Sequence, residues 1–292
     1  MKISTEIGSV KNFCGEEKAV ELCARAGFDA WDFSLFNMID YDWGTGVMKD
    51  GNPRFAAGNY LAFARRLRQI GLDNGITCNQ SHAPFPNLGL PEMKDYFKRS
   101  LECTAEAGGN ICIIHPMNEE SAEKNAEIYN ELLPIAKENG VMIAAENMWC
   151  WDDENDHASA AACSDPESFN AHLDAVNDPF FVACLDLGHA EMFGLGTSAA
   201  EMIRALGPRL KALHVHDNDL KYDSHWLPGY GKMDFDAVLR ALKDVQYDGY
   251  LTLESDRHLE RYNENNYVDG VMEMGRVARR LADKFESLGQ VC

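Results

Sequence analysis

The sequence has no long apolar run and comparatively little positive charge. No stretch comes near the roughly 20 apolar residues of a membrane-spanning helix, and the opening MKISTEIG lacks the basic and apolar segments of a secretion signal. Lysine and arginine number 27 against 47 aspartates and glutamates, which gives a net charge of −20. Such an acidic surface repels polyanions. We therefore expect a cytoplasmic protein without a membrane partner, and nucleic acid is disfavoured as a partner.

Two further absences concern cysteine and glycine motifs. The nine cysteines are scattered singly, with no C-x-x-C pair, so a disulfide framework is not indicated and a reducing compartment fits. No G-x-G-x-x-G turn follows the first strand-like run. Doubly wound folds use that turn to bind a dinucleotide, so its absence weighs against an open sheet of this class.

Short β-type runs alternate with amphipathic stretches along the whole chain. The runs are 2–7, 28–35, 76–83, 110–116, 141–147, 180–189, 210–217 and 249–255. Between them, apolar residues recur at helical spacing in 56–73, 91–107, 120–139, 165–177 and 234–244. Eight such repeats predict an α/β fold, a (β/α)₈ TIM barrel, with residues 1–292 forming a single domain.

Two of the predicted loops are unusually long. Residues 36–55 follow the second run and residues 148–164 follow the fifth, so both lie on the face where barrel enzymes keep their active sites. For 36–55, a substrate wall and an ordinary surface insertion remain equal alternatives. Trp149 and Trp151 favour a functional wall in the second loop.

Acids and histidines fall at the ends of six consecutive strand-like runs. They are His82, His115, Glu146, Asp186 with His189 three residues on, His214 with His216, and Glu254. Any one of them alone has an ordinary structural explanation. Strands of a barrel, however, deliver their ends to one small volume, and buried ionisable groups are costly unless paired or bound to a metal. The set predicts a divalent-cation site.

The donor types indicate which ions fit. Oxygen and imidazole ligands without thiolate suit Mn²⁺, Mg²⁺, Co²⁺ or Zn²⁺, and we expect Mn²⁺ because carboxylates are numerous. Asp217 either orients a ligating imidazole or makes ordinary loop hydrogen bonds, and both alternatives stay open. Beyond it, Asp223 and His225 form an Asp-x-His pair that is either a second chelate or part of a solvated loop. Lys221 and Lys232 are the nearby candidates for holding a phosphate.

These residues lie in recognisable motifs. They are SHAPF (81–85), IIHP (113–116), AAEN (144–147), LDLGH (185–189), HVHDND (214–219), residues 229–235 and YDGYLTLES (247–255). In this combination and order the chain resembles the xylose-isomerase-like TIM-barrel superfamily. That superfamily includes sugar and sugar-phosphate isomerases and epimerases, and also endonuclease IV.

The resemblance to the ketose 3-epimerases implies one divalent metal held by Glu146, Asp186, His214 and Glu254. It implies an isomerase or epimerase of a sugar, keto sugar or polyol that works by proton transfer through an enediolate, with Glu146 and Glu254 as catalytic residues. The substrate-binding residues would be His82, His115, His189, His216 and Trp149. The partner is then a small sugar or sugar-derived substrate, and a homo-oligomer is compatible with the resemblance.

The resemblance to endonuclease IV implies a different reaction. That enzyme binds three metals through nine ligands, and each has a counterpart here: His82, His115, Glu146, Asp186, His189, His214, Asp223, His225 and Glu254. The alternative is therefore a di- or trinuclear phosphodiesterase. The net charge and the scarcity of basic clusters with aromatics favour the sugar enzyme. A non-catalytic metal- or sugar-binding barrel is the third alternative.

Overall fold

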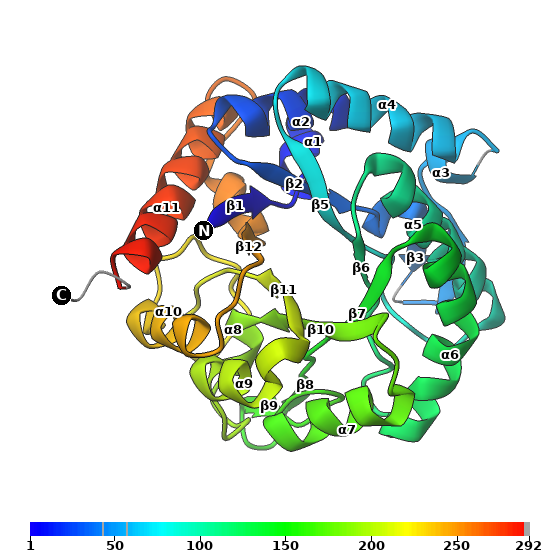
Figure 1. Ribbon diagram of the computed structural model, residues 1–292, viewed down its shortest axis with the longest axis vertical. Helices are drawn as coiled ribbons and strands as arrows, with labels where there is room; N and C mark the ends of the chain where they lie inside the picture. Colours follow the sequence, from blue (N-terminus) through cyan, green and yellow to red (C-terminus); the bar gives the residue numbers. More distant parts are fainter. Residues whose placement is uncertain (43, 57, 289–292) are drawn as a thin grey trace.

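The computed structural model describes residues 1–42, 44–56 and 58–288. Its parallel strands surround one central axis (Figure 1). The barrel strands are β1 (Lys2–Thr5), β2 (Ala30–Ser34), β5 (Thr77–His82), β6 (Ile111–Ile113), β7 (Met142–Glu146), β10 (Phe181–Asp186), β11 (Leu210–His214) and β12 (Tyr250–Leu253). Each falls within one of the predicted β-type runs.

The strands close into a ring. Six of them form a sheet in the order β11-β10-β7-β6-β5-β2, and β1 pairs with β12. The parallel bridges Glu6↔Asp32 and Val215↔Leu253 join the pair to both edges of the six-stranded sheet. Because no edge of the ring is left open, the predicted (β/α)₈ TIM barrel is confirmed.

Helices cover the outside of the ring (Figure 1). They are α1 (Gly8–Cys14), α2 (Glu16–Arg25), α3 (Pro53–Ala56), α4 (Tyr60–Asp73), α5 (Pro91–Ala107), α6 (Ala122–Asn139), α7 (Pro166–Val176), α8 (Leu187–Ala190), α9 (Ala199–Leu206), α10 (Phe235–Asp244) and α11 (Tyr267–Ser287). Sequence signals explain their ends. At α7, for example, the Asp165 carboxylate accepts hydrogen bonds from the backbone N–H groups of Glu167 and Ser168, both at 2.9 Å. Among the described helices, none is long and apolar enough to cross a bilayer.

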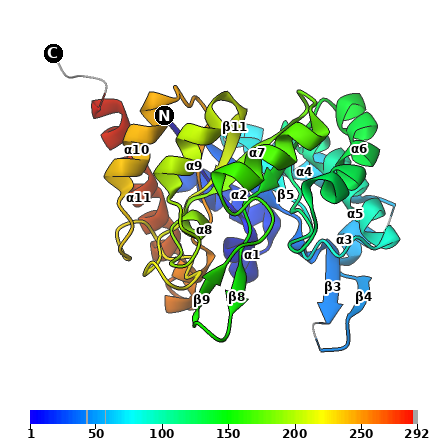
Figure 2. The same ribbon diagram turned by 90° about the horizontal axis from the view of Figure 1, so that it is seen from below.

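Each long loop contains a β-hairpin. The loop after β2 forms β3 (Ile39–Asp42) and β4 (Val47–Asp50), and the loop after β7 forms β8 (Cys150–Asp152) and β9 (His157–Ser159). Both hairpins project from the same side of the barrel (Figure 2). That side is the one reached by the C-terminal ends of the strands, so the hairpins flank the entrance to any site there.

The barrel interior is apolar on one side and polar on the other. Strands β6, β7, β10 and β11 contribute the apolar cluster of Ile111, Ile113, Ala144, Val182, Cys184 and Ala212. Strands β1, β5 and β12 contribute buried polar side chains instead, namely Ser4, Asn79, Gln80 and Thr252. Ser4 Oγ donates to Asn79 Oδ1 at 2.6 Å, and this bond crosses the interior because β1 and β5 are not adjacent.

Close packing of α11 against the end of α2 depends on Gly275. A Cβ atom at this position would lie 2.1 Å from the carbonyl oxygen of Ala26. We therefore expect Gly275→Ala to lower the free energy of unfolding by about 1–3 kcal/mol, measured by urea denaturation. The control is Asp283→Ala on an exposed position of the same helix, which should change that free energy by less than about 0.5 kcal/mol. Equal stabilities for the two variants would contradict this packing.

Candidate metal centre

The strand ends bring the predicted residues together. His82 ends β5, Glu146 ends β7, Asp186 ends β10 and His214 ends β11, while His115 and Glu254 follow β6 and β12. All six residues are buried, with at most 7% of their surface exposed. The ring closure therefore concentrates imidazoles and carboxylates in a volume from which water is largely excluded.

The first ligand group consists of Glu146, Asp186, His214 and Glu254, whose candidate donor atoms all lie within 4.8 Å of one another. His214 Nδ1 lies 3.0 Å from Glu146 Oε1 and 3.2 Å from Glu254 Oε2. Three carboxylates and one imidazole are a donor set that binds Mn²⁺, Zn²⁺ or similar ions.

The second ligand group shares Glu146 with the first and adds His82 and His115. The Nε2 atoms of the two histidines face each other at 3.0 Å. Glu146 Oε2 lies 3.1 Å from His115 Nε2 and 3.5 Å from His82 Nε2. At most one proton fits between the two nitrogens, so lone pairs from all three residues converge on one point. A cation satisfies them together.

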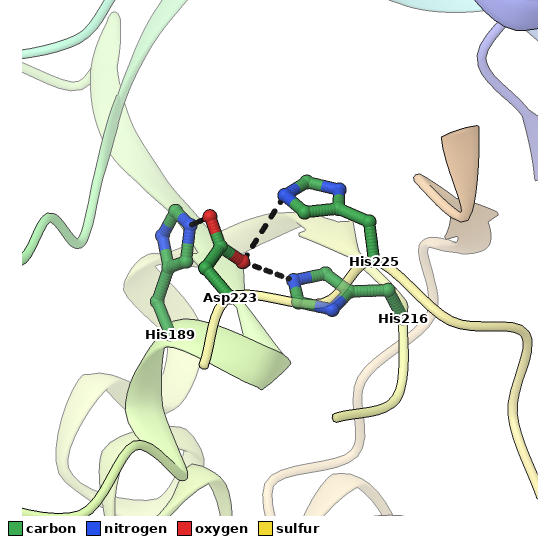
Figure 3. Close-up of side chains that lie close together, drawn as sticks. All are labelled: His189, His216, Asp223 and His225. Atoms are coloured by element: carbon green, nitrogen blue, oxygen red, sulfur yellow. Dashed lines mark ion pairs between the residues drawn. The ribbon is translucent and has the colours of Figure 1, made fainter. Parts of the chain in front are cut away.

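The third ligand group consists of His189, His216, Asp223 and His225 (Figure 3). The three histidines direct Nε2 at the Asp223 carboxylate, at 3.4 Å for His189, 3.5 Å for His216 and 3.1 Å for His225. His225 adopts a φ of 45°, which is uncommon for a residue other than glycine. The loop thus holds an unfavourable backbone conformation that places this imidazole in the group.

Backbone contacts set the orientation of these rings. His189 Nδ1 donates to the carbonyl of Asn147 and His225 Nδ1 to the carbonyl of Glu254, both at 2.8 Å. Donation from Nδ1 directs each Nε2 at the Asp223 carboxylate, and its lone pair becomes available to a ligand once the ring has lost its second proton. His216 stacks on His225 with ring centroids 4.1 Å apart. A Cβ on Gly188 would lie 2.0 Å from the His216 ring, so only glycine fits there.

Asp186 connects the first and third groups. Its Oδ1 lies 3.0 Å from His216 Nε2 and accepts the backbone N–H of His189 at 2.7 Å. Asn147 holds the Asp186 backbone from both sides, through 2.8 and 2.9 Å hydrogen bonds. The three groups therefore form one continuous cluster.

Burial and neighbouring charges shift the pKa values of Glu146 and Glu254 in opposite directions. Burial disfavours the charge on Glu146, but the His214 and His115 rings outweigh it and hold the pKa of Glu146 well below its usual range. Burial dominates at Glu254 and raises its pKa well above the ordinary value. Environments that separate the pKa values of two neighbouring carboxyls are typical of acid–base sites.

The pKa values of His82 and His189 are also shifted in opposite directions. Burial, reinforced by His115, lowers the pKa of His82 well below its usual value, so its ring is neutral. Burial also acts on His189, but Asp186 and Asp223 outweigh it and raise the pKa of His189 to about 10.

Buried carboxylate oxygens that lack a hydrogen-bond partner indicate whether a cation fits the site. Glu146 Oε2 and Asp186 Oδ2 are buried, and neither accepts a hydrogen bond from the described residues. Buried carboxylate oxygens without a partner carry a large desolvation penalty. Because these two atoms lie in ligand groups whose remaining donors are also oxygens and imidazole nitrogens, a divalent ion fits the site.

The structure decides between the two alternatives for Asp217, and it also reveals a residue that was missed. The Asp217 carboxylate has no hydrogen bond to an imidazole among the described residues and makes loop hydrogen bonds instead. It accepts the backbone N–H groups of Gly229, Gly231 and Met233, and so shapes the loop beyond β11. Sequence reasoning missed Asp32, a fully buried carboxylate whose Oδ2 lies 3.5 Å from His214 Nε2. The available signal was a second acid after Asp29 in the run 28–35, placed between Trp31 and Phe33.

A cavity of about 440 Å³ opens beside the cluster. His82 and Glu254 form part of its wall, together with Glu6, Lys11, Phe36 and Glu260. Glu6 accepts hydrogen bonds from the Ser9 backbone and hydroxyl, while burial, reinforced by Asp256, raises the pKa of Glu6 to about 7. The Trp149 ring is 6.4 Å from that of His189, and Trp149 is not among the described residues that line this cavity.

Comparison with known proteins supports the same fold. A family model described as xylose isomerase-like TIM barrel matches residues 20–276. Fructoselysine 3-epimerase of Escherichia coli O157:H7 is 43% identical over 49 residues, which cover 17% of this chain and 18% of that enzyme. A D-tagatose 3-epimerase-like structure superposes with a TM-score of 0.70 at 20% identity, covering 97% of this chain and 99% of the other. The structure of the IOLI protein with a bound zinc atom superposes with a TM-score of 0.68 at 18% identity, and the match covers 98% of each chain.

The raised pKa values predict that metal binding releases protons. Without an ion, Glu254 and His189 are held toward their protonated forms, and each must lose a proton to bind a metal. The apparent affinity should therefore fall as the pH is lowered from about 8 to about 6. Calorimetry in buffers of different ionisation enthalpy measures the released protons. Binding with no net proton release at neutral pH would contradict the assignment of these ligands.

Proposed function

The chain belongs to the xylose isomerase-like TIM barrel family, and we propose that it is a divalent-metal-dependent isomerase or epimerase of a sugar, keto sugar or related polyol. The supporting observation is the convergence of Glu146, Asp186, His214 and Glu254 within 4.8 Å. Sugar 3-epimerases among the related proteins make the same chemistry the natural candidate.

The first ligand group would hold the ion, which we propose to be Mn²⁺, with Zn²⁺, Co²⁺ or Mg²⁺ as alternatives. The zinc bound in a related barrel is consistent with an ion at this face. When bound, the ion supplies polarisation of the substrate's carbonyl and hydroxyl oxygens, which stabilises negative charge next to the carbonyl.

Glu146 and Glu254 are the proposed acid and base. Their opposite pKa shifts leave Glu146 ionised and Glu254 prone to carry a proton. One carboxylate removes the proton from the carbon next to the carbonyl, and the other returns a proton. Return to the opposite face of the same carbon is epimerisation, whereas return to the neighbouring carbon is aldose–ketose isomerisation.

The cavity beside the cluster is the proposed substrate pocket. His82 lies in its wall, and Phe36 packs against His82 with ring centroids 4.3 Å apart. We propose that His82, His115 and His189 contact substrate oxygens and that Trp149 closes the opposite side. His216 is fully buried and directed at Asp186 and Asp223. We therefore place it with the third ligand group instead of the substrate.

The charge of the cavity favours a substrate without phosphate. Glu6, Asp256 and Glu260 line it against Lys11, the only cationic side chain among the described lining residues. Lys221 is paired with Asp156, and neither Lys221 nor Lys232 is among the described residues of this cavity. A phosphate dianion would meet net negative charge there.

Replacement of Glu254 tests the proposed proton transfer. Glu254→Gln keeps the side-chain size but can neither take up nor return a proton, so we expect exchange of the substrate C–H proton with deuterated solvent to slow by about 10²–10⁴-fold. Nuclear magnetic resonance of a panel of ketohexoses and keto sugars measures the exchange. The control, Glu264→Gln, makes the same change on an exposed loop residue and should exchange like the parent. Parent-like exchange by the Glu254 variant would remove this residue from the mechanism.

The second and third ligand groups favour one alternative function. All nine positions expected for a trinuclear centre lie in the three connected groups, and such a centre would suit hydrolysis of a phosphodiester. The net charge of −20 is unfavourable for a nucleic-acid substrate, so a small phosphodiester is the form of this alternative that fits.

Metal counting separates the two functions. For the isomerase or epimerase, elemental analysis of the chain saturated with Mn²⁺ or Zn²⁺ should find about one tightly held equivalent, against about three for the phosphodiesterase. Activity on bis(p-nitrophenyl) phosphate provides a second readout. Three equivalents together with phosphodiester cleavage would overturn the proposed sugar reaction.

A further inference from the structure

Asp32 is a buried carboxylate that belongs to none of the three ligand groups. It lies on β2 and is 0% exposed. Its Oδ2 accepts a hydrogen bond from Gln80 Nε2 at 2.9 Å, whereas its Oδ1 has no hydrogen-bond partner among the described residues. An under-satisfied carboxylate at this depth is unfavourable unless another donor compensates it.

The nearest such donor is the imidazole of His214. Its Nε2 lies 3.5 Å from Asp32 Oδ2 and also lacks a hydrogen-bond partner within the part of the chain that the structure describes. The other ring nitrogen, Nδ1, faces Glu146 and Glu254 at 3.0 and 3.2 Å. The His214 ring thus stands between the first ligand group and Asp32, with one nitrogen directed at each.

We propose that Asp32 is the positioning residue that orients His214 as a metal ligand, an inference that rests on the proposed metal-binding role of His214. An ion bound at Nδ1 confines the proton of the neutral ring to Nε2. The Asp32 carboxylate accepts that proton in a hydrogen bond, fixes the plane of the ring and increases the basicity of Nδ1. The present separation exceeds an ordinary hydrogen bond by roughly 0.5 Å, which a small rotation of either side chain removes.

A buried polar network holds Asp32 in place. Gln80, which donates to Asp32, accepts hydrogen bonds through Oε1 from Asn79 Nδ2 at 3.1 Å and Thr252 Oγ1 at 3.3 Å. Asn79 Nδ2 also reaches Thr252 Oγ1 at 3.1 Å, and Asn79 Oδ1 accepts from Ser4. The polar half of the barrel interior is therefore a chain of contacts from β1 and β12 through β5 to Asp32.

A register shift between β2 and β5 builds this network. Trp31 pairs with Cys78, but Asp32 pairs with Gln80, so Asn79 is an extra residue on β5. In a regular strand consecutive side chains point to opposite faces. The extra residue interrupts that alternation and allows Asn79 and Gln80 both to reach Thr252. The register shift therefore directs the side-chain amide of Gln80 at the Asp32 carboxylate.

Metal affinity tests the proposal without reference to any substrate. The full chain, stripped of ions with a chelator, is titrated with Mn²⁺ and, for spectroscopy, with Co²⁺. Asp32→Asn keeps the size of the side chain but removes its charge, so we expect Mn²⁺ affinity to fall by about 10–100-fold and the visible Co²⁺ absorption to shift. The control is Ser4→Ala, which removes a hydrogen bond at the far end of the same network and should leave both readouts unchanged.

The outcomes distinguish the possible failures. Parent-like Mn²⁺ affinity and Co²⁺ absorption in Asp32→Asn would overturn the positioning role, and so would an equal loss of affinity in Ser4→Ala, which would indicate general loosening. If Asp32→Asn does not fold, Gln80→Met, which keeps the volume but loses the amide donor, must weaken Mn²⁺ binding for the proposal to stand. A parent chain that binds no ion would refute the proposed metal-dependent function together with this inference.

Discussion

The mutual burial of carboxylates and imidazoles at one end of the barrel is the constraint on which the rest of the structure depends. Each such group is expensive to remove from water, and the strands deliver several of them to the same enclosed volume. Hydrogen bonds between them satisfy only part of this need, because Glu146 Oε2 and Asp186 Oδ2 remain without donors among the described residues. Positive charge, from protonated histidines such as His189 or from a bound ion, stabilises buried carboxylates of this kind.

The barrel stabilises this cluster because neighbouring backbone and side-chain groups hold its residues in position. Asn147 holds the Asp186 backbone, backbone carbonyls orient His189 and His225, and Gly188 leaves room for His216. The interior side chains of β6, β7, β10 and β11 are apolar. Beyond this half of the barrel, the local contacts hold Asp186, His189 and His216. On the side of the interior formed by β1, β2, β5 and β12, polar side chains form the hydrogen-bond network that holds Asp32 in place.

The fold and most of the site follow from sequence patterns because both depend on strand periodicity. Strand ends located Glu146, Asp186 and Glu254, and the ring closure then brought them into contact as expected. Asp32 was not found because its importance arises from a register shift against β5, and no local sequence pattern encodes that shift. The role of Asp217 stayed open between two alternatives for a related reason. Its neighbours His214 and His216 suggested a local role, whereas its carboxylate binds backbone groups twelve to sixteen residues further along the chain.

Sharing of residues between the ligand groups connects the question of metal number to the chemistry. Glu146 belongs to the first and second groups, and Asp186 contacts the third through His216. An ion held by the first group would withdraw electron density from Glu146, which would lower the affinity of Glu146 for a second ion and make it a weaker base. Glu254, the carboxyl with the raised pKa, belongs to the first group and not to the second or third, and its Oε1 lies 3.1 Å from His82 Nδ1. A mononuclear centre therefore leaves His82 neutral and free to meet a substrate oxygen, whereas a filled second group would use the same nitrogen lone pair as a ligand. Under the proposed function, substrate contact and additional metal binding are competing uses of the His82 imidazole, because both would need the same Nε2 lone pair.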